Sequence, residues 1–287
     1  VAVAEPYFGL DRPPNFEQRA WHLQRMRDLT GIAADLAIER TTAEERLETA
    51  RRKLLDARRQ RQPPRRDDKV LCGWNALLAR GLLRAGRRLG RDALEQAGDN
   101  LVAWLWQQLW TGKHLRQRWA DGAARGDAFL EDTAALLLAA VESLRWQCDA
   151  ARLQRCTGLA EWLLERFEDD QEGGFFQVPI DREAVLHRGK PMLDDSTPAP
   201  NGLACLALVQ LGHLLGETRY LDAAERGLRC GWHDMQRHPA ATATLLQALQ
   251  EFLSPAPLIV DTGADGDQAR ARLRRRDDLA LVPVVCD

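Results

Sequence analysis

The sequence lacks any run of 18 or more apolar residues, whereas a helix that crosses a membrane needs about 20. It also lacks a secretory signal at its start, because VAVAEPYFG does not have the order of basic, apolar and small residues that such a signal needs. We therefore expect a cytoplasmic protein with no membrane partner. The first residue is Val1 instead of methionine, which indicates a fragment or a processed chain.

Net charge is almost absent as well. The 287 residues include 40 basic and 42 acidic side chains, so no overall field attracts nucleic acid or an anionic membrane. The most basic stretch, residues 51–66, has no interleaved aromatic residues, and Asp56 interrupts it. We interpret this stretch as a solvated helix face and not as an RNA-binding surface.

Metal-binding and redox motifs are missing too. The cysteines form no Cys-x-x-Cys motif, and none pairs with a histidine at the spacing of a zinc site. They are Cys72, Cys148, Cys156, Cys205, Cys230 and Cys286. Because most of them lie in apolar stretches, we expect inert buried thiols in a reducing compartment. The loop DTGADGD contains three aspartates but lacks the closing glutamate of an EF-hand, so the sequence predicts no metal and no cofactor.

The spacing of apolar residues predicts helices almost everywhere between residues 41 and 253. Segments that are apolar around most of their circumference must be enclosed by other helices. These are residues 74–86, 133–141, 202–212 and 242–249. The segments between them carry an apolar stripe on one side and charged residues on the other. They are residues 92–109, 150–169 and 219–237.

This alternation of inner and outer helices is typical of a helical toroid or solenoid built from hairpins. Leu89-Gly90 and Leu215-Gly216 separate an inner from an outer helix, and we expect each glycine to form the C-terminal cap. The sequence contains three complete hairpins and a fourth inner helix, whereas a closed ring needs about six hairpins. The predicted fold class is therefore all-α, and the ring is incomplete.

We expect three parts along the chain. Residues 1–66 form an irregular segment followed by a charged helix, which begins at a threonine cap near Thr41 and ends at Pro63. Residues 67–254 form the toroid. Residues 255–287 have the pattern of a small strand, helix and strand, an α/β appendage.

The two longest connections, residues 111–127 and 169–199, run from an outer helix to the next inner helix. The long loops therefore gather at the end of the ring where the inner helices begin, and loops on a rigid scaffold commonly carry function. In DDSTPAPNG, we expect Pro198 or Pro200 in the first turn of an inner helix, with Asp195 or Ser196 capping its amides. Capping and turn formation alone also explain Asp194, Ser196 and the prolines.

Polar residues at this end of the inner helices are candidates for a central cavity. They are Asn75, Asp132, Asn201 and His238. Asp132 is in register with apolar residues, where a carboxylate needs partners, whereas Glu131 points about 100° away and is expected to pack or cap. A mouth that mixes aromatic faces with polar groups would suit a sugar or another small-molecule ligand.

The expected ligand-binding residues are Trp74, Asn75, Arg118, Trp119, Phe175, Phe176, Ser196 and Asn201. Arg118 and the positive ends of the inner helices would tolerate a carboxylate or phosphate on the ligand. For each tryptophan, packing in the core is the alternative.

Five stretches resemble, in order and spacing, the C-terminal half of the spermatogenesis-associated protein 20 family of thioredoxin-domain-containing proteins. They are RRDDKVLCGWNALLARGLLRAGRRLG, LRQRWADGAARGDAFLEDTAALLLAAVESL, DDQEGGFFQV, LDDSTPAPNGLACLALVQLGHLLG and RHPAATATLLQAL. The resemblance implies an upstream thioredoxin-like domain and then an (α/α)6 barrel similar to N-acylglucosamine 2-epimerases and six-hairpin glycosidases. It implies that this chain begins after the first barrel hairpins. The chain departs from the family pattern at Cys72-Gly73 and at Thr133.

Two classes of function remain open. A carbohydrate-active enzyme would use Asp132 and His238 as acid and base for epimerisation, or Asp132 and Asp195 as paired carboxylates for hydrolysis. A non-catalytic module would instead bind a ligand or act as a scaffold for the upstream thioredoxin-like domain.

Overall fold

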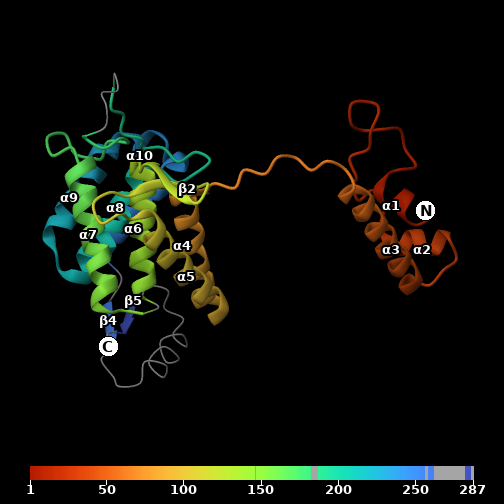
Figure 1. The fold of residues 1–287 in the computed structure, drawn as a ribbon, viewed down its shortest axis with the longest axis horizontal. Coiled ribbons are helices and arrows are strands. Elements are labelled where there is room, and N and C mark those ends of the chain that lie inside the picture. The colour runs from red at the N-terminus through yellow and green to blue at the C-terminus, as the bar shows by residue number, and fades with distance from the viewer. Residues whose placement is uncertain (146, 182–186, 256–257, 262–281, 286–287) are drawn as a thin grey trace. The chain divides into compact units, whose positions relative to one another are not determined.

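The computed structural model describes residues 1–145, 147–181, 187–255, 258–261 and 282–285. Contacts between residues divide the chain into two units, Val1–Asp67 and Asp68–Asp287. Figure 1 shows the fold of each unit. In the described part of the chain, no helix combines the length and the apolar composition that crossing a membrane requires.

The first unit consists of three helices around a small apolar core. They are α1 (Ala4–Phe8), α2 (Leu29–Asp35) and α3 (Arg40–Arg59). The core residues are Val3, Ile32, Ala33, Ala43 and Leu47. The expected threonine cap near Thr41 is wrong, because α3 begins at Arg40 and its N-cap is Glu39, which makes no side-chain capping bond. The second half of α3 is exposed, as its charged sequence requires.

The second unit is an all-α arrangement of hairpins, as predicted. The inner helices are α4 (Cys72–Leu89), α6 (Leu130–Leu144), α8 (Pro200–Leu215) and α11 (Ala243–Leu253). The outer helices are α5 (Asp92–Leu109), α7 (Ala150–Phe167), α9 (Thr218–Cys230) and the short α10 (Trp232–Arg237). The predicted outer helix at residues 219–237 is thus broken at Gly231, which caps α9 and precedes α10.

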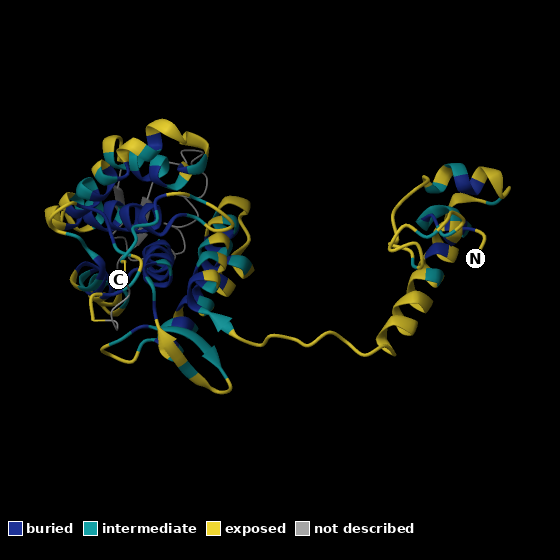
Figure 2. Cartoon of the chain, turned by 90° about the horizontal axis from the view of Figure 1, so that it is seen from above, coloured by how far each residue is buried: buried dark blue, intermediate teal, exposed yellow. Residues whose placement is uncertain are grey.

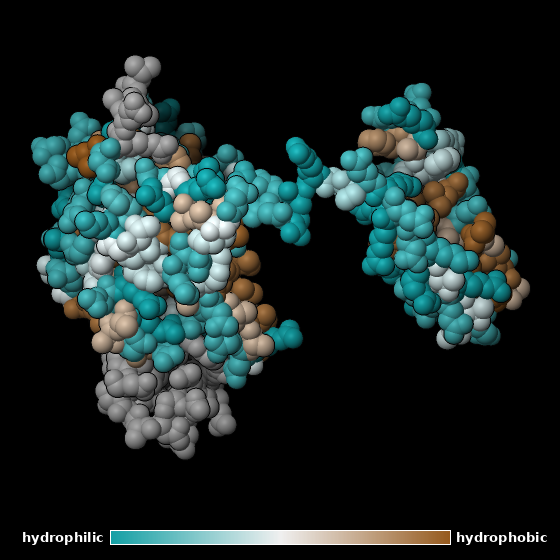
Figure 3. Space-filling view, viewed as in Figure 1, coloured by the Kyte–Doolittle hydropathy of each residue, from teal (hydrophilic) through white to brown (hydrophobic). Residues whose placement is uncertain are grey.

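Burial follows the predicted alternation. Almost every residue of α6 and α8 is buried, so these helices are enclosed on all sides, whereas α7 and α9 bury only one face. Figure 2 shows the dark blue inner helices of this unit among helices with exposed outer surfaces. The helix α4 is different, because Trp74 is 66% exposed and Leu78 is 54% exposed. Figure 3 shows apolar side chains over the edge that α4 and α5 form, where the series of hairpins is open.

Glycines set the turns and the close contacts between helices. Gly90 and Gly216 end α4 and α8 with φ of 63° and 67°, which confirms the predicted caps. Gly98 on α5 allows a close crossing with α4, because a Cβ there would lie 2.8 Å from the carbonyl oxygen of Ala79. Gly202 has the same role between α8 and α11, where a Cβ would lie 2.9 Å from the side chain of Thr244.

A small antiparallel sheet was not predicted. Its order is β1 (Val70–Leu71), β2 (Arg116–Ala120) and β3 (Ala123–Asp127), so most of the segment 111–127 is a hairpin and not a loop. Asp121 and Gly122 form the two-residue turn with φ of 51° and 74°. Asp-Gly is a strong hairpin signal, since both residues tolerate the left-handed conformation that such a turn needs.

The last described elements are two strands. The strands β4 (Leu258–Asp261) and β5 (Val282–Val285) pair in parallel, and both fall within the expected appendage. The helix expected between them lies outside the described residues. A short 3-10 helix, η1 (Pro239–Ala241), precedes α11.

Candidate functional site

The N-terminal ends of the inner helices lie together with the long connections, and we call this end of the second unit the rim. The strand β1 leads directly into α4 and pairs with β2, while β3 ends just before α6 (Figure 1). The connection at residues 168–199 reaches α6 and α11. The amide of Leu130 donates to the carbonyl of Gln177 at 3.0 Å, and the amide of Asp194 donates to the carbonyl of Ala241 at 2.7 Å.

Asp132 links two inner helices at the rim. Its Oδ1 accepts a hydrogen bond from the amide of Gly73 at 2.9 Å, and its Oδ2 accepts one from the amide of Phe129 at 3.1 Å. The first bond caps α4 and the second caps α6 itself, so one side chain satisfies donors at two helix N-termini. The partners that a carboxylate needs at this position are therefore backbone amides.

Burial changes the chemistry of Asp132. The residue is 4% exposed, and burial raises the pKa of its carboxyl from 3.8 to about 6, with a smaller contribution from the charge of Glu131. The amides of Phe129 and Gly73 oppose this shift, because hydrogen bonds to a carboxylate favour its ionised form. Asp132 is therefore a carboxylic acid that changes protonation close to neutral pH.

A small cavity of about 60 Å³ opens beside Asp132, and we call it the rim cavity. Its lining combines aromatic, carboxylate and amide groups. The lining residues are Leu71, Gly73, Trp74, Leu77, Gln117, Glu131, Asp132, Thr197, Pro198 and Leu203. Four segments of the rim therefore meet here: the start of α4, the strand β2, the start of α6 and the loop before α8.

Glu131 and Gln117 line the rim cavity, although neither was among the candidate site residues from the sequence. Glu131 was expected to pack or cap, yet it is half-buried and lines the rim cavity next to Asp132. Gln117 was hidden in the segment interpreted as a loop, and the strand β2 brings it to the cavity. The Asp121-Gly122 hairpin signal could have revealed this strand.

The two candidate asparagines make local backbone contacts. The Asn75 amide donates to the carbonyl of Leu71 at 2.8 Å, which closes the first turn of α4. Asn201 is completely buried: it accepts from the amide of Phe175 at 2.7 Å and donates to the carbonyls of Phe175 and Pro191. Asn201 therefore fixes the loop before α8, and neither asparagine lines the rim cavity.

The capping residue in the segment before α8 differs from expectation. Asp194, and not Asp195 or Ser196, accepts from the amide of Ala199 at 2.7 Å and from the amide of Thr244 at 2.9 Å. It thus caps α8 and α11 in the way that Asp132 caps α4 and α6. Asp195 and Ser196 are exposed, and Pro200 is the proline in the first turn of α8.

His238 is exposed and precedes η1. It does not line the rim cavity. Its carbonyl accepts from the hydroxyl of Thr242 at 3.0 Å, so its backbone helps to shape the entry into α11.

The remaining candidates are divided between the core and the hairpin. Phe175 is completely buried, which is the packing alternative, and Phe176 lies under the guanidinium of Arg188 at 4.0 Å. Trp119 packs edge-on against Trp104 of α5, with ring centres 6.1 Å apart. Arg118 donates to the side chain of Gln117 at 2.8 Å and so supports a residue that lines the rim cavity.

Five of the cysteines lie within the described residues, and none of these five forms a disulfide. Cys72, Cys148, Cys156 and Cys205 are buried, and Cys230 is half-buried. Burial raises the pKa of the Cys156 and Cys205 thiols to about 12, so both stay protonated and unreactive at neutral pH. Among the described residues, no group of three or more His, Cys, Asp or Glu side chains is arranged to hold a metal ion.

The hairpins and the loop-bearing rim define an all-α fold that is part of an (α/α)6 toroid. The GH76 alpha-mannanase of Bacteroides thetaiotaomicron superposes with a TM-score of 0.50 at 11% sequence identity. The match covers 60% of this chain and 47% of the mannanase chain, and it concerns the fold alone.

In sequence, the chain is similar to spermatogenesis-associated protein 20. It is 26% identical to the human protein over 212 residues, which cover 69% of this chain and 26% of that protein. It is also 26% identical to the rat protein over 250 residues, which cover 82% of this chain and 31% of that protein. These matches confirm the resemblance to this family, and the chain spans about a quarter to a third of the length of these relatives. No protein-family model matches the chain.

Proposed function

We propose that the second unit is the carbohydrate-binding part of a carbohydrate-active (α/α)6 domain and that the rim cavity is its binding site. The observation that carries this proposal is the buried carboxyl of Asp132, whose pKa is raised to about 6, next to Glu131 and close to the exposed ring of Trp74. An aromatic face beside paired carboxylates suits a sugar ring, since it combines apolar contact with acceptors for hydroxyl groups.

The chemistry that this arrangement supports is proton transfer to or from a sugar. With a pKa of about 6, Asp132 is partly protonated near neutral pH and can act as a general acid. Glu131 would act as the second group, in place of His238, because Glu131 lines the rim cavity and His238 does not. For hydrolysis, Asp195 remains a further candidate, since it is exposed on the loop whose Thr197 and Pro198 line the cavity.

A non-catalytic module is the second candidate, and the size of the rim cavity favours it. Its volume of about 60 Å³ is well below the ~300 Å³ at which ligand pockets usually begin. Both oxygens of Asp132 also accept backbone amides, so the carboxyl has a structural role without any substrate. In this case the unit would bind a ligand weakly or serve as a scaffold for an upstream thioredoxin-like domain.

A sugar panel tests the proposal. Neutral mono- and disaccharides are added to the full chain, and the melting temperature is measured, because a ligand that binds only the folded state raises it. We expect at least one sugar to stabilise the chain. Trp74→Ala should weaken its binding about tenfold, which corresponds to about 1.4 kcal/mol. The matched control is Trp232→Ala on α10, since Trp232 is 50% exposed and does not line the rim cavity.

Turnover assays then separate the two candidates. If Asp132→Asn abolishes turnover of a sugar that the variant still binds, the unit is an enzyme. Binding without turnover in the unaltered chain favours the non-catalytic module. If no sugar changes the melting temperature, the carbohydrate proposal fails.

We also propose a reducing, cytoplasmic location. The five described cysteines support it, because they form no disulfide and thiols persist in a reducing compartment. Fractionation of cells that produce the protein should place it with cytoplasmic markers. Its recovery with secreted proteins would contradict this location.

A further inference from the structure

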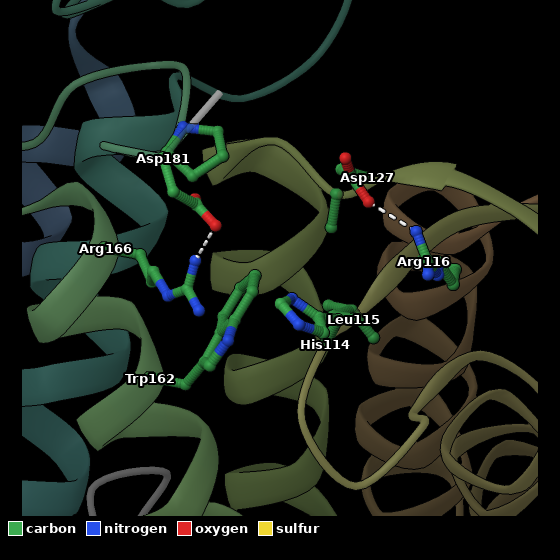
Figure 4. Close-up of a pocket in the computed structure, with 9 residues that line it drawn as sticks. His114, Leu115, Arg116, Asp127, Trp162, Arg166 and Asp181 are labelled. Carbon is green, nitrogen blue, oxygen red and sulfur yellow. Dashed lines mark hydrogen bonds and ion pairs between the residues drawn. The ribbon is translucent and has the colours of Figure 1, made fainter. Parts of the chain in front are cut away.

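A second and larger cavity of about 290 Å³ lies on the outer side of the hairpin β2–β3, between the hairpin and α7. Figure 4 shows its walls: the hairpin on one side and the C-terminal part of α7 with the following loop on the other. Its volume is close to the ~300 Å³ at which small-molecule sites begin. We call it the outer cavity.

Each of two facing walls carries an ion pair. On the hairpin, Nη1 of Arg116 donates to Oδ1 of Asp127 at 2.5 Å. On the opposite wall, Arg166 of α7 pairs with Asp181 of the following loop. Figure 4 shows these two pairs on either side of the cavity, with Trp162 and His114 between them.

The polar groups of these walls are balanced in charge. The hydrogen bond from Arg166 lowers the pKa of Asp181, so this carboxylate stays ionised at neutral pH. Each guanidinium is thus neutralised by one aspartate. A site of this kind exerts little net attraction on anions or cations, but each wall presents N–H donors next to carboxylate acceptors.

The floor is rigid and partly apolar. The indole N–H of Trp162 donates to the carbonyl of Lys113 at 3.1 Å, and the ring packs edge-on against Trp110 and Phe167. Trp162 is only 8% exposed, so its position is fixed before any ligand arrives. A preformed floor limits the entropy that is lost on binding.

The outer cavity is separate from the rim cavity, because β2 divides them. Successive residues of a strand point to opposite faces, and Arg116 lines the outer cavity whereas Gln117 lines the rim cavity. In the segment that leads into α6, Asp127 lines the outer cavity, whereas Asp132 lines the rim cavity.

We propose that the outer cavity is a second binding site and that its ligand is a neutral polyhydroxylated molecule, a sugar residue of an oligosaccharide. Hydroxyl groups both donate and accept hydrogen bonds. Each ion pair can therefore bind two vicinal hydroxyls, because the guanidinium donates to one and the carboxylate accepts from the other. The proposal shares its ligand class with the proposed function but does not require the rim cavity to bind.

The test measures binding of neutral disaccharides to the full chain by isothermal titration, with inorganic phosphate as the charged comparison. We expect neutral disaccharides to bind and phosphate not to bind. Arg166→Met should weaken binding at the outer cavity at least tenfold, because it removes the donors of one wall and keeps only an unbranched apolar side chain. The matched control is Arg219→Met, since Arg219 pairs with Glu161 of the same helix α7 and does not line the cavity.

A second variant guards against a folding defect. Asp127→Asn changes the opposite wall at a side chain that is 58% exposed, and it should also weaken binding while leaving the melting temperature close to that of the unaltered chain. Binding that is lost in Arg166→Met and Asp127→Asn but kept in Trp74→Ala supports this proposal and contradicts the rim site. Binding that is lost only in Trp74→Ala, or phosphate binding in place of sugar binding, overturns it.

Discussion

Asp132 and Asp194 show how one side chain can join two helices. Each carboxylate accepts amides from two segments: Gly73 and Phe129 for Asp132, and Ala199 and Thr244 for Asp194. Four donors at helix N-termini that would otherwise be unsatisfied are thereby bonded. The same two residues therefore position the rim loops, so stability and any binding at the rim depend on each other.

The titration of Asp132 should be visible in the pH dependence of stability. Its pKa is about 6 in the folded chain and 3.8 in an unperturbed carboxyl, so the folded state binds this proton more tightly. Between these values the folded state holds more protons, and the free energy of unfolding falls as the pH rises through the window. Across this window the free energy of unfolding falls by on the order of 3 kcal/mol.

Asp132→Asn removes this titration. We expect the variant to be less stable than the unaltered chain by a margin that is larger at pH 4 than at pH 7, as measured by urea unfolding at both values. Both proteins contain every other titrating group, so the difference between their free energies of unfolding reports on Asp132 alone. A margin that is equal at both pH values would show that burial does not raise the pKa of Asp132.

At the scale of elements, the hairpins depend on close approach between inner and outer helices. The crossing of α4 and α5 has no room for a side chain at Gly98, since a Cβ would lie 2.8 Å from the Ala79 carbonyl and 2.9 Å from the side chain of Leu83. Backbone cannot move away without separating the two helices. The crossing therefore requires glycine even though glycine lowers helix propensity.

Gly98→Ala and Gly81→Ala form a matched pair that tests this contact. Gly81 is exposed in α4 and a Cβ there would meet nothing within 4 Å, so alanine should stabilise the chain by about 0.5 to 1 kcal/mol through helix propensity. At Gly98 the same gain is outweighed by overpacking, and we expect a net loss of about 1 to 3 kcal/mol. Thermal unfolding of both variants measures the difference, and a stabilised Gly98→Ala would contradict the packing of α4 on α5.

At the scale of the whole molecule, patterns of burial were easier to predict than polar contacts. The enclosed helix α6 was recognisable because its apolar residues cover the whole circumference, and the glycine caps follow from local conformation. The sheet was missed because its strands are short and polar, as in RQRWA and AARGD. The strand β2 also pairs with β1, and the local sequence of the hairpin does not encode that contact.

In the candidate site, too, the sequence predicted some features and missed others. The sequence correctly indicated that Asp132 needs partners, but it could not distinguish backbone amides from a ligand. Asn201 is completely buried and donates to loop carbonyls, whereas Asp194 accepts amides at the start of two helices. One partner of Asn201 is 26 residues away and one partner of Asp194 is 50 residues away, and rules based on local spacing cannot identify such contacts.

The division of the chain into two units predicts where a protease cuts first. Residues 61–69 are exposed and contain neither helix nor strand, whereas α3 ends at Arg59 and β1 begins at Val70. Proteases need an extended segment, so limited trypsin treatment should cleave after Arg65 or Arg66 before it cleaves the arginines of α3. Mass spectrometry of the early products identifies the first cut.

The fragment that begins at Asp67 should stay folded, because the apolar core of the second unit shares no described residue with that of the first. Its thermal transition and its sugar binding should match those of the full chain. Replacing Arg61, Arg65, Arg66 and Lys69 together with glutamine should slow the first cut. Early cleavage within the hairpin β2–β3 instead would contradict the assignment of residues 61–69 as the most accessible segment, and a fragment that unfolds after the cut would show that the second unit depends on the first.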